Sequence, residues 1–90
     1  PYIDSITIIK TEEYKDFCET HPTLLDEIEA TEEKIQTWVE YNKKLHEPIK
    51  NGKWKGYLHA RINQNLRIMY LYDPATKTLI YQAIVDKDNF

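Results

Sequence analysis

The stretch WKGYLHARINQNLRIMYLY, residues 54–72, predicts two β-strands joined by a short loop. Its segments Leu58–Ile62 and Leu66–Tyr72 are rich in apolar and aromatic side chains, which favour strands. The polar triplet Asn63–Asn65 between them suits a three-residue hairpin loop, in which Asn65 is able to adopt left-handed backbone angles. The sequence therefore predicts a β-hairpin in the second half of the chain.

Pairing counted outward from this loop gives the hairpin one apolar face. The apolar pairs are Ile62 with Leu66, Ala60 with Ile68, and Leu58 with Tyr70. The other face carries Arg61 directly opposite Arg67, with His59 and Tyr57 beside them. Like charges directly across a ladder are unfavourable. Their juxtaposition indicates a site where an anion, such as a phosphate, lies between the two guanidinium groups.

The remaining segments predict one more strand before two helices, and one after the hairpin. Ile3–Ile9 is rich in β-branched residues and reads as the first strand. Thr11 suits the N-cap of a short helix that ends near His21. Thr23–Asp26 resembles the capping signal of a second, longer helix. The apolar stripe of that helix consists of Leu24, Leu25, Ile28, Ile35, Trp38 and Val39.

After the hairpin, Thr78–Val85 has apolar residues on both faces, which favours an interior strand. The element order is therefore β-α-α-β-β-β, and residues 1–90 form a single domain of the α+β class. We expect a small antiparallel sheet with the two amphipathic helices packed on one face. The opposite, helix-free face would then carry Arg61, Arg67 and His59.

Composition excludes several classes of protein. Hydrophobic residues make up 41% of the chain and charged residues 30%, which is ordinary for a soluble globular domain. No apolar run approaches the roughly 20 residues that span a bilayer, so no membrane partner is expected. One cysteine cannot form an internal disulfide, which favours a cytoplasmic location. The three histidines show no metal-ligand spacing, so neither a metal nor another cofactor is expected.

The net charge of -3 conceals an uneven distribution. Residues 1–42 hold eleven acids and three bases, whereas residues 43–67 hold seven bases and one acid. The basic central stretch suits contact with nucleic acid, and Lys53 and Lys55 within it are candidates for substrate binding. The alternative is a set of solvated lysines around a loop, which is common on protein surfaces.

Together with this element order, three sequence pieces resemble the RelE/ParE superfamily of bacterial toxins, in particular the YafQ-like branch of type II toxin–antitoxin modules. The pieces are GKWKGY at residues 52–57, RIMY at residues 67–70 and the terminal aromatic Phe90. The resemblance implies a small sheet with two helices on one side. Enzymatic members cleave messenger RNA in the ribosomal decoding site and are neutralised by an antitoxin, whereas ParE-like relatives target DNA gyrase. For this chain it implies an antitoxin, the ribosome and messenger RNA as partners.

The implied reaction is attack of a ribose 2′-OH on the neighbouring phosphorus, which needs a base, cations and an acid. By resemblance, Arg67 matches the strand arginine over the phosphate. Arg61 stands where the YafQ-like branch has a histidine, and it can stabilise charge but cannot act as a base. Asn65 stands where that branch has an aspartate, and Asp86 where relatives use a tail histidine as acid or base. Phe90 matches the aromatic that packs near the substrate in relatives.

These departures leave the acid and base open, and His46, Glu47 and His59 near the same loop and strand are available replacements. An active endoribonuclease with rearranged catalytic groups is one interpretation. The other is a non-catalytic module that binds an antitoxin or inhibits a protein target such as gyrase. The candidate catalytic residues are Arg67, Arg61, His59, Asp86, His46 and Glu47, and the candidate substrate-binding residues are Lys53, Lys55, Phe90 and Asn65.

Overall fold

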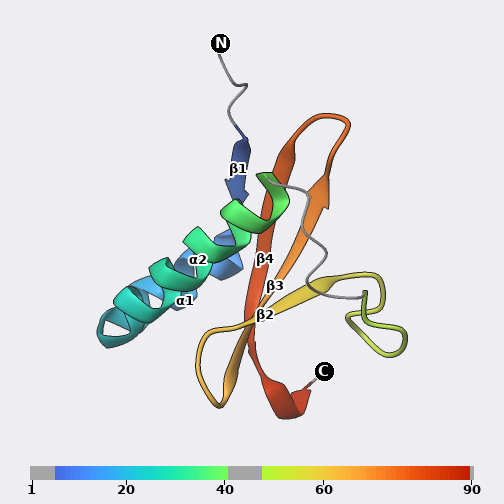
Figure 1. Ribbon diagram of the computed structural model, residues 1–90. Helices are drawn as coiled ribbons and strands as arrows, with labels where there is room; N and C mark the ends of the chain where they lie inside the picture. Colours follow the sequence, from blue (N-terminus) through green and yellow to red (C-terminus); the bar gives the residue numbers. More distant parts are fainter. Residues whose placement is uncertain (1–5, 41–47, 90) are drawn as a thin grey trace.

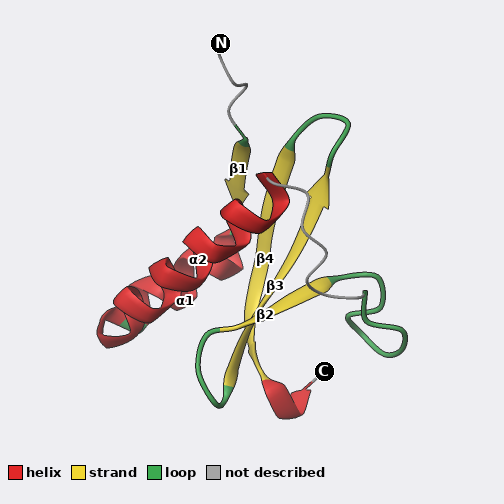
Figure 2. Cartoon of the chain, viewed as in Figure 1, coloured by secondary structure: helices red, strands yellow, loops and turns green. Residues whose placement is uncertain are grey.

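The computed structural model describes residues 6–40 and 48–89 (Figures 1 and 2). In this part of the chain two α-helices lie together on one side of a four-stranded sheet. The elements are β1 (Thr7–Lys10), α1 (Glu12–Thr20), the 3₁₀ turn η1 (Pro22–Leu24), α2 (Leu25–Glu40), β2 (Leu58–Arg61), β3 (Leu66–Asp73), β4 (Thr78–Asp86) and the 3₁₀ turn η2 (Lys87–Asn89). The predicted α+β class and element order are confirmed.

The sheet is mixed rather than purely antiparallel. Its strand order is β1-β4-β3-β2, in which the pairs β2–β3 and β3–β4 are antiparallel and the pair β1–β4 is parallel. The prediction of an antiparallel sheet was therefore wrong for its first strand. The two helices return the chain between β1 and the meander, and such a long connection allows the parallel pairing with β4. The interior position predicted for β4 is confirmed.

The hairpin register matches the prediction, because Leu58 pairs with Tyr70, Ala60 with Ile68 and Arg61 with Arg67. The Ile62 amide donates to the Leu66 carbonyl at 2.9 Å, which leaves a three-residue loop.

The backbone conformation predicted for this loop was wrong. Among the described non-glycine residues only Lys77 has a positive φ, at 54°, so Asn65 is not left-handed. The side chain of Asn63 closes the loop instead, since its Oδ1 accepts hydrogen bonds from the amides of Asn65 and Leu66 at 2.8 and 2.9 Å. This Asx-type closure forms the turn without a left-handed residue.

The predicted N-cap of α1 is confirmed, and it also attaches the helix to the sheet. Thr11 Oγ1 accepts a hydrogen bond from the Tyr14 amide at 3.2 Å and donates to the Gln82 carbonyl at 2.6 Å. Gln82 is the extra residue of a β-bulge, because Met69 pairs with Ala83 while Tyr70 pairs with Tyr81. The second helix begins at Leu25, directly after η1, and the predicted capping residue Thr23 lies inside that turn.

The main core lies between the helices and the sheet. Its buried side chains are Tyr14, Ile28, Ile35, Ala60, Ile68, Tyr70, Leu79, Tyr81 and Ile84. A polar group was not foreseen here: Glu32, only 7% exposed, accepts a 2.6 Å hydrogen bond from the Tyr14 hydroxyl and lies 3.4 Å from the Lys10 ammonium. The Tyr81 hydroxyl donates to the Glu32 backbone carbonyl at 3.1 Å. This network fastens α2 to α1, β1 and β4.

A smaller apolar cluster covers part of the helix-free face. Trp54, Met69 and Ala83 are buried there, with Ile49 and Tyr57 packed against them. The loop before β2 folds onto this cluster, with hydrogen bonds of 2.9 Å from the Ile49 amide to the Tyr57 carbonyl and 2.8 Å from the Gly56 amide to the Ile49 carbonyl. Trp54 and Tyr57 thus anchor this loop to the sheet. No helix within residues 6–40 and 48–89 is long and apolar enough to cross a membrane.

Candidate functional site

Arg61 and Arg67 lie at one end of the sheet, beside the β2–β3 loop. Strand alternation places both on the helix-free face, because their neighbour Ile68 lies in the core under the helices. Arg61 Nε donates to the Asn63 carbonyl oxygen at 3.3 Å, and Arg67 Nη1 donates to the same oxygen at 2.8 Å. Because both bonds end on one oxygen, Arg61 Nε and Arg67 Nη1 are no farther apart than the sum of the two hydrogen-bond lengths. The predicted convergence of the guanidinium groups is present.

Both arginines are held by neutral groups. Besides the Asn63 carbonyl, Arg67 Nη1 contacts the carbonyl oxygens of Leu66 at 3.0 Å and Gln64 at 3.4 Å. Within the described residues neither guanidinium forms an ion pair with a carboxylate, including those of Asp86 and Asp88. No acid in the described part of the chain therefore neutralises the positive charge of the pair, which can act on an anionic ligand.

His59 lies on the same face, opposite Met69 and two residues from Arg61 on β2. Burial lowers its pKa below the ordinary value of 6.5, and the positive charge of Arg67 lowers it further. Both effects disfavour a second positive charge, so the imidazole is neutral at neutral pH. A neutral imidazole beside two guanidinium groups is able to accept a proton from a group bound between them.

The tail residue Asp86 is placed differently from the arginines. It pairs with Leu66, one register position beyond Arg67, and so belongs to the opposite face of the sheet. Its Oδ1 accepts a 2.9 Å hydrogen bond from the Asp88 amide, which starts η2. The structure thus does not place this carboxylate on the face of the arginine pair. The other candidates His46, Glu47 and Phe90 lie outside the described residues.

The candidate substrate-binding lysines border the helix-free face. Lys53 and Lys55 are exposed on the loop that packs Trp54 against Met69, the cross-strand partner of His59. The Lys53 ammonium lies 5.3 Å from the centre of the Trp54 ring, within the range of a cation–π contact. The loop thus places two further positive charges on the side of the sheet that carries the arginines.

Asn65, the remaining candidate, takes part through its backbone. Its amide donates to Asn63 Oδ1, and its carbonyl accepts a 2.8 Å hydrogen bond from the Lys87 amide. The first turn after β4 is therefore fastened to the hairpin loop, and Figure 1 shows both at the same end of the sheet.

Sequence reasoning missed Asn63, whose carbonyl and side chain organise this region. The signal was present, because asparagine at the start of a turn commonly accepts a hydrogen bond from an amide two residues later. The triplet contains two asparagines, however, and the left-handed preference of asparagine directed attention to Asn65 rather than to Asn63.

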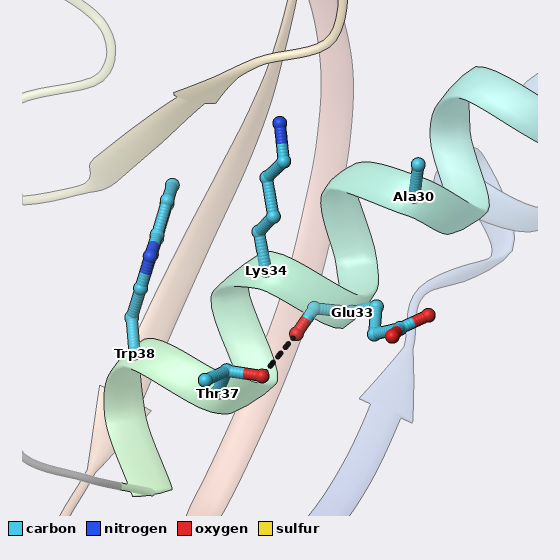
Figure 3. Close-up of a pocket in the computed structure, with 5 residues that line it drawn as sticks. All are labelled: Ala30, Glu33, Lys34, Thr37 and Trp38. Carbon is cyan, nitrogen blue, oxygen red and sulfur yellow. Dashed lines mark hydrogen bonds between the residues drawn. The ribbon is translucent and has the colours of Figure 1, made fainter.

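A hollow of about 330 Å³ lies elsewhere, along α2 (Figure 3). It is lined by Ala30, Glu33, Lys34, Thr37 and Trp38. Figure 3 shows Lys34 and Trp38 extending from the same side of the helix, and Thr37 Oγ1 donating to the Glu33 carbonyl at 3.0 Å. None of the described candidate residues lines this hollow.

No known protein family matches the sequence, and no curated protein is similar to it in sequence. Solved structures are nevertheless similar in fold. The YoeB/ParE toxin from Agrobacterium tumefaciens has a TM-score of 0.67 at 17% identity, over 90% of this chain and 98% of that chain. YafQ in the E. coli DinJ–YafQ toxin–antitoxin complex has a TM-score of 0.62 at 18% identity, over 94% of this chain and 96% of that chain. The Mycobacterium tuberculosis RelBE2 toxin–antitoxin complex contains a chain with a TM-score of 0.63 at 15% identity, over 93% of this chain and 100% of that chain. The chain has the fold shared by these toxins.

Proposed function

We propose that this protein is the toxin of a type II toxin–antitoxin module and acts as a ribosome-dependent messenger RNA endonuclease. The observation that carries the proposal is the convergence of Arg61 and Arg67 on one carbonyl oxygen, with the neutral imidazole of His59 on the same face. The fold shared with YafQ and YoeB/ParE toxins supports it.

The proposed reaction is an internal transfer of the phosphodiester bond. The 2′ oxygen loses its proton and bonds to phosphorus, and the bond from phosphorus to the 5′ oxygen breaks, which leaves a 2′,3′-cyclic phosphate and a 5′-OH. Neutral His59 would accept the 2′ proton, while Arg61 and Arg67 would stabilise the charge on the phosphoryl oxygens. The arginines stay protonated near neutral pH, so the 5′ oxygen must take its proton from water or from another group such as His46.

The charge distribution supports RNA on the helix-free face. Exposed carboxylates dominate the helices, at Glu12, Glu13, Asp16, Glu19, Asp26, Glu27, Glu29, Glu33 and Glu40. The lysine loop and the arginine pair lie on the other side of the sheet. Because physiological salt limits electrostatic reach to about 8 Å, the acidic helices do not cancel the attraction of the basic face for phosphate. They also repel RNA, which favours a single orientation.

The proposed partners are a cognate antitoxin, the ribosome and messenger RNA, in the cytoplasm. The structural neighbours from E. coli and M. tuberculosis are complexes of a toxin with its antitoxin, which supports the first of these. A non-catalytic module that binds an antitoxin or a protein target such as gyrase is the second candidate. It is favoured by the placement of Asp86, which caps η2 rather than facing the arginines.

Purified protein added to translating ribosomes tests the proposal. We expect cleavage of the ribosome-bound message, and Arg67→Ala should slow it by about 10²–10³-fold, as when one preorganised donor is removed from an active site. Lys15→Ala on α1 is the matched control, because it also removes one positive charge but lies among the acidic helices. Intact message with folded wild-type protein that still captures an antitoxin would favour the non-catalytic module.

A further inference from the structure

The hairpin loop Asn63–Asn65 holds three parts of the candidate site at once. The Asn63 carbonyl accepts hydrogen bonds from Arg61 and from Arg67, and the Asn65 carbonyl accepts one from the Lys87 amide. The conformation of this loop therefore sets the direction of both guanidinium groups and the start of the C-terminal turn.

The loop itself depends on one side chain. Oδ1 of Asn63 accepts the amides of Asn65 and Leu66 at 2.8 and 2.9 Å, whereas Asn65 contributes only backbone atoms and Gln64 only its carbonyl. Removing the Asn63 amide would leave two backbone donors without their acceptor, and the loop would open to let water bind them. The Asn63 carbonyl would then lose the orientation in which both arginines reach it.

We propose that Asn63 is a positioning residue, which orders Arg61 and Arg67 before a phosphate binds. Arginine side chains carry large rotamer entropy, and a ligand that must immobilise two of them binds more weakly than one that meets them already in place. Like charges also repel, so two guanidinium groups stay together only where shared acceptors hold them. One carbonyl oxygen bonded by both supplies such an acceptor. The effect of Asn63 on RNA binding rests on the proposed function. The positioning of the two arginine side chains by Asn63 does not, because it is a property of the RNA-free protein.

The guanidinium proton signals in nuclear magnetic resonance spectra of the RNA-free protein test the ordering directly, namely the Nε proton of Arg61 and the Nη1 protons of Arg67, which donate to the Asn63 carbonyl. In the wild type we expect dispersed, slowly exchanging signals for Arg61 and Arg67, assigned by replacing each with lysine. In Asn63→Ala, both signals should move to the chemical shifts that are typical of mobile, solvent-exposed arginine side chains. Asn63→Ser keeps a weaker acceptor and should restore them in part. Gln64→Ala is the control in the same loop, because only its carbonyl takes part, and it should leave the signals unchanged.

A second measurement concerns binding of a short 2′-O-methyl oligoribonucleotide, which cannot be cleaved. Asn63→Ala should lower its affinity about tenfold through lost preorganisation, and Asn63→Ser should recover part of it. The dependence of affinity on salt should stay the same, because every charge remains. Arg67→Ala, by contrast, should reduce the salt slope by about 0.7, the value for one contact with a single-stranded phosphate.

The outcomes separate the two proposals. A wild type that binds no oligonucleotide and cleaves no message refutes the proposed function, while the arginine signals still decide whether Asn63 orders the pair. Unchanged arginine signals in folded Asn63→Ala refute the positioning role, whatever the protein does to RNA. If Asn63→Ala does not fold, Asn63→Ser decides, because signals identical to those of the wild type would show that the amide is dispensable.

Discussion

The Thr31 hydroxyl on α2 donates a 3.2 Å hydrogen bond to the backbone carbonyl of Arg61 on the edge strand β2. The single hydroxyl proton is shared with the Glu27 carbonyl within the helix, at 3.0 Å, so the bond is bifurcated. The bond to Arg61 satisfies a carbonyl at the edge of the sheet and joins the helix layer to the strand that carries half of the arginine pair. It is a direct hydrogen bond between the acidic helices and the basic face.

Thr31→Val should therefore destabilise the protein by about 1 kcal/mol, because an isosteric methyl cannot donate to the Arg61 carbonyl. Urea unfolding followed by tryptophan fluorescence measures the change. Thr37→Val is the matched control, since Thr37 makes the same bond within the helix, to Glu33, but no bond to a strand. Its effect should stay within about 0.5 kcal/mol. Equal losses in both variants would show that the contact with β2 contributes nothing.

The lowered pKa of His59 predicts the direction of a pH effect on stability. Because the folded-state pKa lies below the ordinary 6.5, the unfolded chain binds more protons as pH falls past that value. The stabilisation that comes from neutral His59 is fully present above pH 6.5 and is lost as pH falls through the folded pKa. Unfolding midpoints between about pH 5 and pH 7.5 should show this decline. His59→Gln, which does not titrate, should remove that part of the slope; an unaltered slope would assign it to other groups.

Loss of the hydrogen bond between Tyr14 and Glu32 should lower the free energy of unfolding, although only one hydroxyl group is removed from the core. Tyr14→Phe removes the donor of the 2.6 Å bond to a buried carboxylate and should cost about 1–3 kcal/mol. Burial and the bond to Glu32 raise the pKa of Tyr14 far above its usual value, so ionisation of the hydroxyl does not interfere. Thermal unfolding measures the loss. Tyr72→Phe is the control, because its hydroxyl makes no hydrogen bond within the described residues, and a comparable loss there would contradict the assignment.

Lys77 is a position where stability can be gained. Its φ of 54° is a conformation that asparagine visits more readily than lysine, so Lys77→Asn should raise the free energy of unfolding by about 0.5 kcal/mol. Ala75→Asn, in the same turn but without a positive φ, should give no gain. Chemical denaturation compares the two, and an equal effect at both positions would mean that the backbone conformation of Lys77 is not the cause.

Local alternation was sufficient to predict the hairpin and the juxtaposition of Arg61 and Arg67, because a buried face fixes the register of a pair of strands. The parallel pairing of β1 with β4 was not accessible, since it joins segments about seventy positions apart and leaves no local pattern. Glu32 was missed because it lies among exposed glutamates of α2, and only tertiary contact with Tyr14 and Lys10 distinguishes it.

The candidate site was predictable to different degrees. Arg61, Arg67 and His59 share a face because they alternate along paired strands, which the sequence alone reveals. Asp86 was expected near them by resemblance, but its face is set by pairing with Leu66. Its carboxylate caps the turn η2, which sequence analysis did not predict. His46, Glu47 and Phe90 stay predictions.

The bulge at Gln82 divides β4 into two lengths, residues 78–81 and residues 83–86. Residues 78–81 pair with β1, whereas residues 83–86 pair with the part of β3 that carries Arg67. The Thr11 hydroxyl donates to the Gln82 carbonyl at the junction of the two lengths, and β3 pairs with both of them. Residues 78–81 lie between two strands, whereas residues 83–86 pair with β3 alone. Backbone amides of residues 83–86 are therefore expected to exchange with solvent deuterium faster than those of residues 78–81. Local opening of the sheet would then begin at the end that carries Arg67 and leave the pairing with β1 intact.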